Sequence, residues 1–214
     1  MRYQMVIFDM DGTILETLED IWHSVNVTMD AMGCPRRSYE EVRSFVGNGA
    51  AVLIQRCMPQ GAEDPRWEQA LAYFKDYYGL HAQDKTGPYE GIPELLATLQ
   101  GRGVKLAVVS NKPDSNVQDL CRAYFPGVFP VVMGDHPDRA KKPAPDSVYA
   151  AIDALGGDRA CAVYVGDSEV DLATARNAGL PCIAVTWGFR GEDHLLAHGA
   201  QVLAHTPDEL LELL

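Results

Sequence analysis

Residues 5–13 read MVIFDMDGT, a compact apolar run that ends at Asp9 and continues into a second aspartate and a glycine. An apolar run of this length, closed by polar turn residues, is typical of a strand that is buried on both faces. Similar runs follow at residues 104–109, 128–133, 161–165 and 182–185. Segments with helical spacing of apolar residues separate most of these runs, and this alternation predicts a mostly parallel, doubly wound α/β sheet.

Residues 16–84 interrupt the alternation of strands and helices. Apolar residues recur at helical spacing over 18–32 and 67–78, and shorter helical segments are expected at 42–46 and 52–57. The sequence therefore predicts an all-helical domain, residues 16–84, inserted into an α/β domain made of residues 1–15 and 85–214.

Composition narrows the classes of partner. The chain has 18 Lys and Arg against 30 Asp and Glu, a formal charge of −12, which argues against nucleic acid because phosphate backbones bind basic surfaces. No apolar run is long enough to span a bilayer. The five cysteines form no CxxC pair, as expected of reduced thiols. We expect a cytoplasmic protein without a membrane partner, and both a monomer and a homodimer remain open.

Polar clusters follow the predicted strands at four places. They are Asp9–Thr13, Ser110–Lys112, Lys141–Pro143 and Gly166–Asp171. In open parallel sheets, ligands bind at the carboxyl ends of the strands, near the point where the strand order reverses. We therefore expect these clusters to meet in one crevice.

Such a crevice would hold the carboxylates of Asp9, Asp11, Asp167 and Asp171. Carboxylates that share a site repel one another, and some stay protonated unless a cation compensates their charge. A hard divalent ion with oxygen ligands meets this need, and Mg²⁺ commonly uses one or two carboxylates together with substrate phosphate and water. The sequence therefore predicts a magnesium site.

The remaining polar residues suit a phosphate. Lys142 can neutralise phosphate charge, and Ser110 and Asn111 can donate hydrogen bonds at the start of a helix. A carboxylate such as Asp9 can attack phosphorus as a nucleophile. A second carboxyl group, Asp11, can protonate the leaving oxygen and later take a proton from water.

The four clusters resemble, in their order along the chain, the motifs of the haloacid dehalogenase superfamily. The motif residues are Asp9–Thr13, Ser110, Lys142 and Gly166–Asp171. The resemblance covers nearly the whole chain and implies a Rossmann-like core with an inserted cap domain. It also implies that Asp9 is the nucleophile and a metal ligand, and that Asp11 is the general acid/base and binds Mg²⁺ through its main-chain carbonyl.

The resemblance implies roles for the other motif residues as well. Asp167 would be a further metal ligand, and Asp171 would support metal-bound water or Lys142 from outside the ligand set. Asp171 is alternatively an ordinary carboxylate at a helix N-terminus. Thr13, Ser110, Asn111 and Lys142 would hold the transferred phosphoryl group.

The sequence is most similar to the phosphoglycolate phosphatases within this superfamily. Val46–Ala50 resembles their cap loop, which implies that Gly47, Asn48 and Gly49 bind substrate, although such a segment also serves as a plain helix connector. Glu16 replaces the aspartate that often follows the first motif, and this departure weakens the substrate assignment. The expected activity is hydrolysis of 2-phosphoglycolate or a similar small phosphoester.

Other activities remain open. A phosphosugar mutase, a nucleotidase or a pyrophosphatase would use the same intermediate, and a non-catalytic phosphate-binding module could share the fold. Dehalogenation of a haloacid is disfavoured, since it needs neither a metal nor Asp11.

Overall fold

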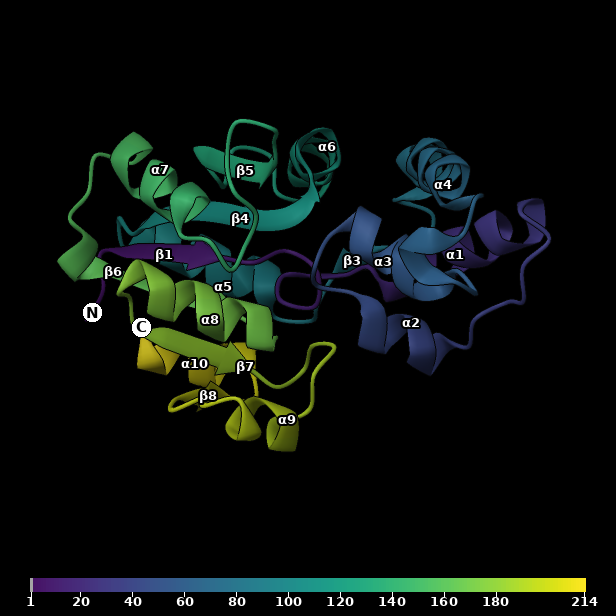
Figure 1. Ribbon diagram of the computed structural model, residues 1–214. Coiled ribbons are helices and arrows are strands. Elements are labelled where there is room, and N and C mark those ends of the chain that lie inside the picture. Colours follow the sequence, from purple (N-terminus) through teal and green to yellow (C-terminus); the bar gives the residue numbers. More distant parts are fainter. Residues whose placement is uncertain (1) are drawn as a thin grey trace. The chain divides into compact units, whose positions relative to one another are not determined.

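The computed structural model describes residues 2–214, which fold as two compact units (Figure 1). One unit contains the residues up to Leu15 and those from Pro88 onward, and the other is Glu16–Gly87. The chain leaves the first unit through β2, Leu15–Glu16, and returns through β3, Gly87–Pro88, and these short strands pair with each other.

The first unit is built on a six-stranded sheet with the order β5-β4-β1-β6-β7-β8, in which each pair of neighbouring strands is parallel. Its strands are β1 Met5–Phe8, β4 Lys105–Pro113, β5 Val131–Asp135, β6 Ala162–Gly166, β7 Cys182–Val185 and β8 Leu203–Ala204. Phe8 of the central strand β1 lies opposite Val108 of β4 and Val165 of β6. This register aligns the carboxyl ends of the three strands that carry predicted site residues.

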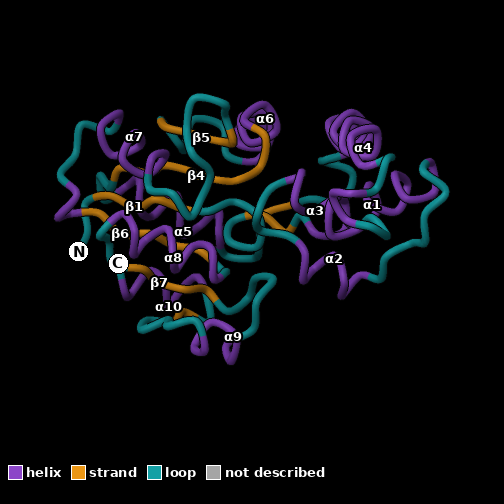
Figure 2. Tube along the Cα trace, in the orientation of Figure 1, coloured by secondary structure: helices purple, strands orange, loops and turns teal. Residues whose placement is uncertain are grey.

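Helices cover both faces of this sheet, as the tube in Figure 2 shows. They are α5 Ile92–Gly101, α6 Asp114–Tyr124, α7 Asp146–Ala154, α8 Glu169–Ala178, α9 Glu192–Ala197 and α10 Pro207–Leu213, with a 3₁₀ turn at Arg159–Cys161. Val6 and Phe8 of β1 belong to a buried cluster with residues of α5, α6 and α10, whereas Met5 and Ile7 belong to one with residues of α7 and α8. The predicted doubly wound α/β class is therefore confirmed.

Small residues let α8 pack closely against the sheet. Ala175 and Ala178 are buried in the cluster that α8 shares with α7, and Gly179 ends the helix with a φ of 69°. A residue at this C-terminal position adopts a left-handed conformation that glycine accepts without steric cost. The predicted end of this helix agrees with the structure.

The sequence pattern was less accurate at the edges of the sheet. The strand expected at 128–133 begins only at Val131, and β4 continues past residue 109 to Pro113. The elements β8, α9 and α10 were not predicted. They have two, six and seven residues, too few for a periodic apolar pattern to stand out.

The second unit is helical. It contains α1 Leu18–Ala31, α2 Tyr39–Phe45, α3 Ala50–Cys57 and α4 Trp67–His81, with a 3₁₀ turn at Gly61–Glu63. Ser38 and Glu41 form a capping box at the start of α2, an arrangement that satisfies two main-chain donors. Residues 47–49 lie in the connection between α2 and α3.

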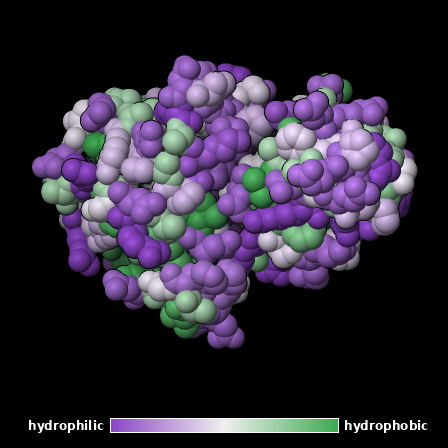
Figure 3. Space-filling view, viewed as in Figure 1, coloured by the Kyte–Doolittle hydropathy of each residue, from purple (hydrophilic) through white to green (hydrophobic). Residues whose placement is uncertain are grey.

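The surface is mainly polar on the face drawn in Figure 3. Within residues 2–214, no helix combines the length and apolar character that crossing a membrane would require.

Candidate active site

The first site loop begins where β1 ends. Asp9 follows Phe8 directly, and its carboxylate Oδ1 accepts a hydrogen bond of 2.7 Å from the main-chain N–H of Met10. Gly12 then turns the chain with a φ of 81°, a region open to glycine. A Cβ atom at this position would collide with the carboxylate of Asp167. The glycine therefore brings the loop after β1 against the loop after β6.

Three carboxylates from two of these loops form a buried cluster. Asp9, Asp167 and Asp171 each offer an oxygen, and these atoms all lie within 4.8 Å of one another. Burial, and then the charge of Asp171, raise the pKa of Asp9 from 3.8 to about 7. Burial and the charges of Asp171 and Asp9 raise the pKa of Asp167 well above its usual value. A divalent cation with oxygen ligands would relieve this repulsion, so the donor set fits Mg²⁺.

Both carboxylate oxygens of Asp167 have a partner. Oδ2 accepts a hydrogen bond of 2.7 Å from the main-chain N–H of Phe189, and Oδ1 lies 3.4 Å from the hydroxyl of the fully buried Thr13. Thr13, which was predicted to bind phosphate, therefore directs its hydroxyl toward this aspartate.

Lys142 lies between two of the buried carboxylates. Its Nζ is 2.8 Å from Oδ1 of Asp9 and 2.8 Å from Oδ1 of Asp171, and it donates to the Tyr164 hydroxyl at 3.1 Å. Burial by itself would lower the pKa of Lys142, but the charges of Asp171 and Asp9 raise it well above its usual value. The amine is therefore protonated and places a positive charge next to Asp9.

Asp171 uses both of its oxygens within the protein. Oδ2 accepts hydrogen bonds from the N–H and the hydroxyl of Ser168, at 3.1 and 2.6 Å, and closes a capping box at the start of α8. Oδ1 accepts from Lys142 and, at 3.2 Å, from the Tyr164 hydroxyl. These contacts place Asp171 where it fixes the lysine.

The carboxyl-terminal part of β4 supplies the second motif. The side chain of Asn111 accepts a bond from the Lys142 N–H at 2.9 Å and donates one to the Lys142 carbonyl at 3.0 Å. Its amide thus joins the second and third motifs. Ser110 is buried, and its hydroxyl accepts a bond of 3.3 Å from the N–H of Lys112.

Lys112 belongs to the predicted Ser110–Lys112 cluster, but the sequence reasoning assigned it no role. Its buried Nζ lies 3.1 Å from Oδ1 of Asp11, so the Asp11 side chain pairs with a lysine while the three-carboxylate cluster contains Asp9, Asp167 and Asp171. The only signal in the sequence was a basic residue directly after Ser110 and Asn111. Tyr164, inside β6, gave no signal at all because it reads as a core residue.

The structure thus brings the four predicted motifs of the α/β unit to one end of the sheet. Gly47, Asn48 and Gly49 lie in the helical unit, and their substrate contact stays a prediction.

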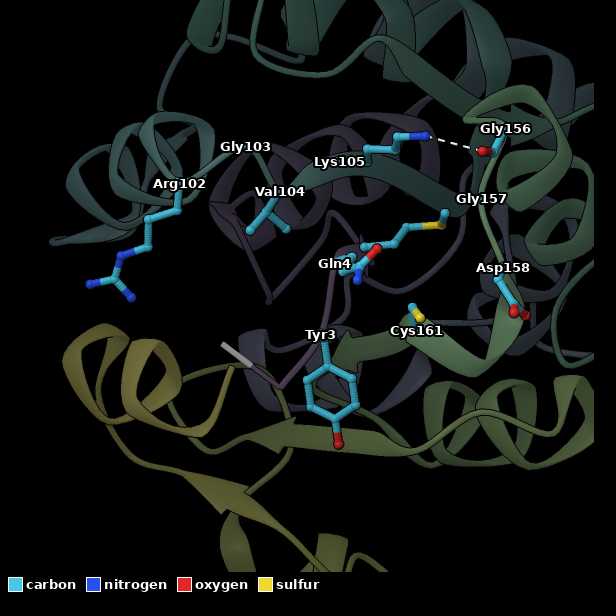
Figure 4. A pocket seen from close by; sticks show the side chains of 11 residues that line it. Tyr3, Gln4, Arg102, Gly103, Val104, Lys105, Gly156, Gly157, Asp158 and Cys161 are labelled. Atoms are coloured by element: carbon cyan, nitrogen blue, oxygen red, sulfur yellow. Dashed lines mark hydrogen bonds between the residues drawn. The ribbon is translucent and has the colours of Figure 1, made fainter.

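A cavity of about 330 Å³ lies elsewhere in the α/β unit (Figure 4). Its lining includes Gln4, Met5 and Lys105, at the amino ends of β1 and β4. The Lys105 amine donates to the carbonyls of Leu155 and Gly156, at 2.7 and 3.1 Å. The cavity is therefore at the other end of these strands from Asp9, and Lys105 caps the carbonyl groups that follow α7.

Comparison with known proteins agrees with this geometry. Residues 6–185 match the family described as haloacid dehalogenase-like hydrolase, and the chain belongs to this family.

Three relatives refine the comparison. An N-acetylmuramic acid 6-phosphate phosphatase of Pseudomonas aeruginosa is 33% identical over 100% of this chain and 96% of its own length. A phosphoglycolate phosphatase of Pseudomonas putida is 31% identical over 98% of this chain and 76% of its own length. A crystal structure from Lactobacillus delbrueckii subsp. bulgaricus, provisionally assigned to the phosphoglycolate phosphatases, has a TM-score of 0.96 and 38% identity, and the match covers 100% of this chain and 98% of that one. The predicted enzyme class, a phosphoric monoester hydrolase of this family, is confirmed.

Proposed function

We propose that the chain is a Mg²⁺-dependent phosphomonoester hydrolase that forms an aspartyl-phosphate at Asp9. The observation that carries the proposal is the buried Asp9 carboxylate, which lies 2.8 Å from the Lys142 amine and within a cluster of three carboxylates. A nucleophile, a fixed positive charge and a cation-binding group are thus next to one another, as phosphoryl transfer requires.

The metal would be held by the carboxylates of Asp9 and Asp167 and, as the family resemblance implies, by the main-chain carbonyl of Asp11. Bound Mg²⁺ supplies positive charge beside the phosphoryl oxygens and lowers the repulsion among the carboxylates. Asp171 has both oxygens bonded to Ser168, Tyr164 and Lys142, which supports a role in holding the lysine.

The reaction would proceed in two steps at the chain's own residues. An oxygen of Asp9 bonds to phosphorus, the bond from phosphorus to the ester oxygen breaks, and Asp11 gives that oxygen a proton. Asp11 then takes a proton from water, whose oxygen attacks the phosphoaspartate and releases phosphate and free Asp9. Lys142, Ser110 and Thr13 would steady the phosphoryl group, and Asn111 would hold Lys142 through its main chain.

The helical unit is proposed to act as a cap over this site. Closure of such a unit would exclude water during transfer to Asp9. Gly47, Asn48 and Gly49, between α2 and α3, would then contribute the substrate-facing loop.

The leading substrate is 2-phosphoglycolate, which is supported by the similarity to phosphoglycolate phosphatases. N-acetylmuramic acid 6-phosphate is a second candidate, because the relative named for it matches nearly its whole length whereas the Pseudomonas putida relative is matched over 76%.

The test is phosphate release from a panel of esters, measured with Mg²⁺ and with EDTA. The panel holds 2-phosphoglycolate, N-acetylmuramic acid 6-phosphate, nucleotides, pyrophosphate and hexose phosphates, and kcat/KM ranks them. We expect the highest value for 2-phosphoglycolate and no release in EDTA. Formation of sugar-phosphate isomers without phosphate release would support a mutase, and binding without turnover would contradict an enzyme.

A further inference from the structure

In the strand order of the sheet, β4 with the second motif lies on one side of β1, and β6 and β7 lie on the other. The loop after β7 therefore reaches the site from the side opposite the second motif. We call residues 187–190 the 187–190 loop; they lie within the connection between β7 and α9 (Figure 1). The indole Nε1 of Trp187 donates to the carbonyl of Thr13 at 3.0 Å, and the N–H of Phe189 donates to Oδ2 of Asp167 at 2.7 Å. One short loop therefore holds both the loop after β1 and the acidic residue after β6.

Gly188, between these two donors, lies in direct contact with the same two segments. A Cβ atom at this position would collide with the carbonyl of Gly12 and with the side chain of Asp167. The obstruction is main chain on one side and a fixed carboxylate on the other, so neither can move aside at low cost. Only glycine lets the 187–190 loop approach this closely.

The end of the 187–190 loop is anchored separately. Arg190 is buried, and its Nε donates to Oε2 of Glu169 at 3.1 Å. Glu169 is the first residue of α8, two positions after Asp167. The loop is thus fixed at Trp187 to the loop after β1, and at Phe189 and Arg190 to the segment after β6 that carries Asp167.

We propose that the 187–190 loop is the positioning element for the metal ligand Asp167, and that the indole of Trp187 anchors it. The inference rests on the proposed Mg²⁺ site. Hydrogen bonds to a ligating carboxylate orient it, and their loss typically weakens metal binding by about 10–100-fold. The Phe189 N–H makes such a bond, and Trp187 and Gly188 set where that N–H lies.

The test measures Mn²⁺ binding to the full chain in the absence of substrate, from the electron paramagnetic resonance signal of free Mn²⁺. Trp187→Phe removes the indole N–H and keeps an aromatic ring. We expect the Kd for Mn²⁺ to rise about tenfold. Trp67→Phe is the matched control, because the buried indole nitrogen of Trp67 has no hydrogen-bond partner within residues 2–214. We expect this control to bind as the wild type does.

Gly188→Ala probes the same loop without touching the tryptophan. We expect a rise in the Kd for Mn²⁺ that exceeds the roughly tenfold rise of Trp187→Phe, and phosphatase activity that recovers as Mg²⁺ is raised. Circular dichroism shows whether Gly188→Ala folds. If it does not fold, the Mn²⁺ affinity of Trp187→Phe alone tests the role of the 187–190 loop.

The outcomes separate the two proposals. Wild-type Mn²⁺ affinity in Trp187→Phe overturns the role of the 187–190 loop and leaves the proposed hydrolase intact. An equal loss in Trp67→Phe also overturns that role, since the effect would not be local. A wild-type chain that binds no Mn²⁺ and releases no phosphate overturns the proposed function and the loop's role together.

Discussion

Asp9 of the α/β unit and Asp20 of the helical unit are both buried aspartates, 8% and 4% exposed, and their surroundings differ in kind. Oδ2 of Asp20 accepts hydrogen bonds from the N–H of Lys85 and from the N–H and hydroxyl of Thr86, at 2.8–3.0 Å. Asp9 shares its site with Asp167 and Asp171.

The difference separates an acid with a structural role, Asp20, from the acid proposed to act in catalysis, Asp9. Asp20 accepts hydrogen bonds from donors of its own unit, and these bonds hold residues 85–86, near the end of the helical unit, against α1. Asp9 faces other negative charges, and burial and Asp171 raise its pKa to about 7. Burial alone therefore does not indicate an active-site acid. A better indication is a buried carboxylate that the fold keeps close to other carboxylates despite their repulsion.

The largest expected effect is on catalysis. Asp9→Asn removes the proposed nucleophile, and we expect phosphate release to fall about 10⁴-fold. Asp20→Asn should keep kcat within about twofold of wild type at a temperature where the variant is folded, because Asp20 bonds to Lys85 and Thr86 of its own unit. Steady-state phosphate release on the preferred ester measures both. Activity above a tenth of wild type in Asp9→Asn would contradict the assignment of the nucleophile.

The second effect is the pH dependence of stability in metal-free protein. The folded-state pKa of Asp9, about 7, is raised above the usual 3.8. At pH values between these two, the folded chain therefore holds a proton on Asp9 that the unfolded chain has lost. The free energy of unfolding should therefore fall as pH rises from about 4 to about 7, by on the order of 2–4 kcal/mol. Urea unfolding in EDTA measures this fall.

Asp9→Asn provides the control for this pH effect, since asparagine does not titrate. We expect a smaller fall in the variant over the same pH range, and Mg²⁺ should raise the stability of the wild type at pH 8. Parallel pH curves for wild type and variant would contradict the repulsion inferred at Asp9.

The third effect is a loss of stability in the helical unit. Asp20→Asn weakens three hydrogen bonds to a buried charged acceptor, and we expect a loss of about 2 kcal/mol. Urea unfolding at pH 7 measures it. Asp138→Asn is the matched surface change, because the Asp138 side chain is 83% exposed, and it should leave stability within about 0.5 kcal/mol of wild type. Equal stability of Asp20→Asn and wild type would contradict a structural role for Asp20.

The sequence predicted the α/β fold and the motif residues because both depend on local patterns. An apolar run ending at Asp9 indicates a strand and its carboxyl end, and parallel pairing then aligns Phe8 with Val108 and Val165. The partner of a side chain depends on distances that no local pattern contains. Asn111 was expected at the phosphate, yet its amide is bonded to the main chain of Lys142.

The same limit explains the residues that sequence reasoning missed. Trp187 is 174 positions from Thr13, the carbonyl it binds, and Tyr164 reads as an ordinary core residue of β6. Gly188 is informative only once Gly12 and Asp167 are placed beside it. Such contacts follow from the packing of distant loops at one end of the sheet, which spacing along the chain does not encode.

The smallest expected effect is on thermal stability and concerns His205, an exposed histidine next to the carboxylates of Glu192 and Glu209. Hydrogen bonds from His205 to Glu209 and Glu192 raise the pKa of the imidazole. A raised histidine pKa stabilises the fold below its unfolded value near 6.5 and loses that effect as pH rises through the folded value. His205→Gln should therefore lower Tm by only about 1 °C at pH 5.5 and by less at pH 9, because exposed ion pairs are screened. Differential scanning calorimetry at the two pH values measures this, with His136→Gln as an exposed control. A larger loss at pH 9 than at pH 5.5 would show that His205 acts through packing rather than charge, and would remove it from the comparison with Asp9.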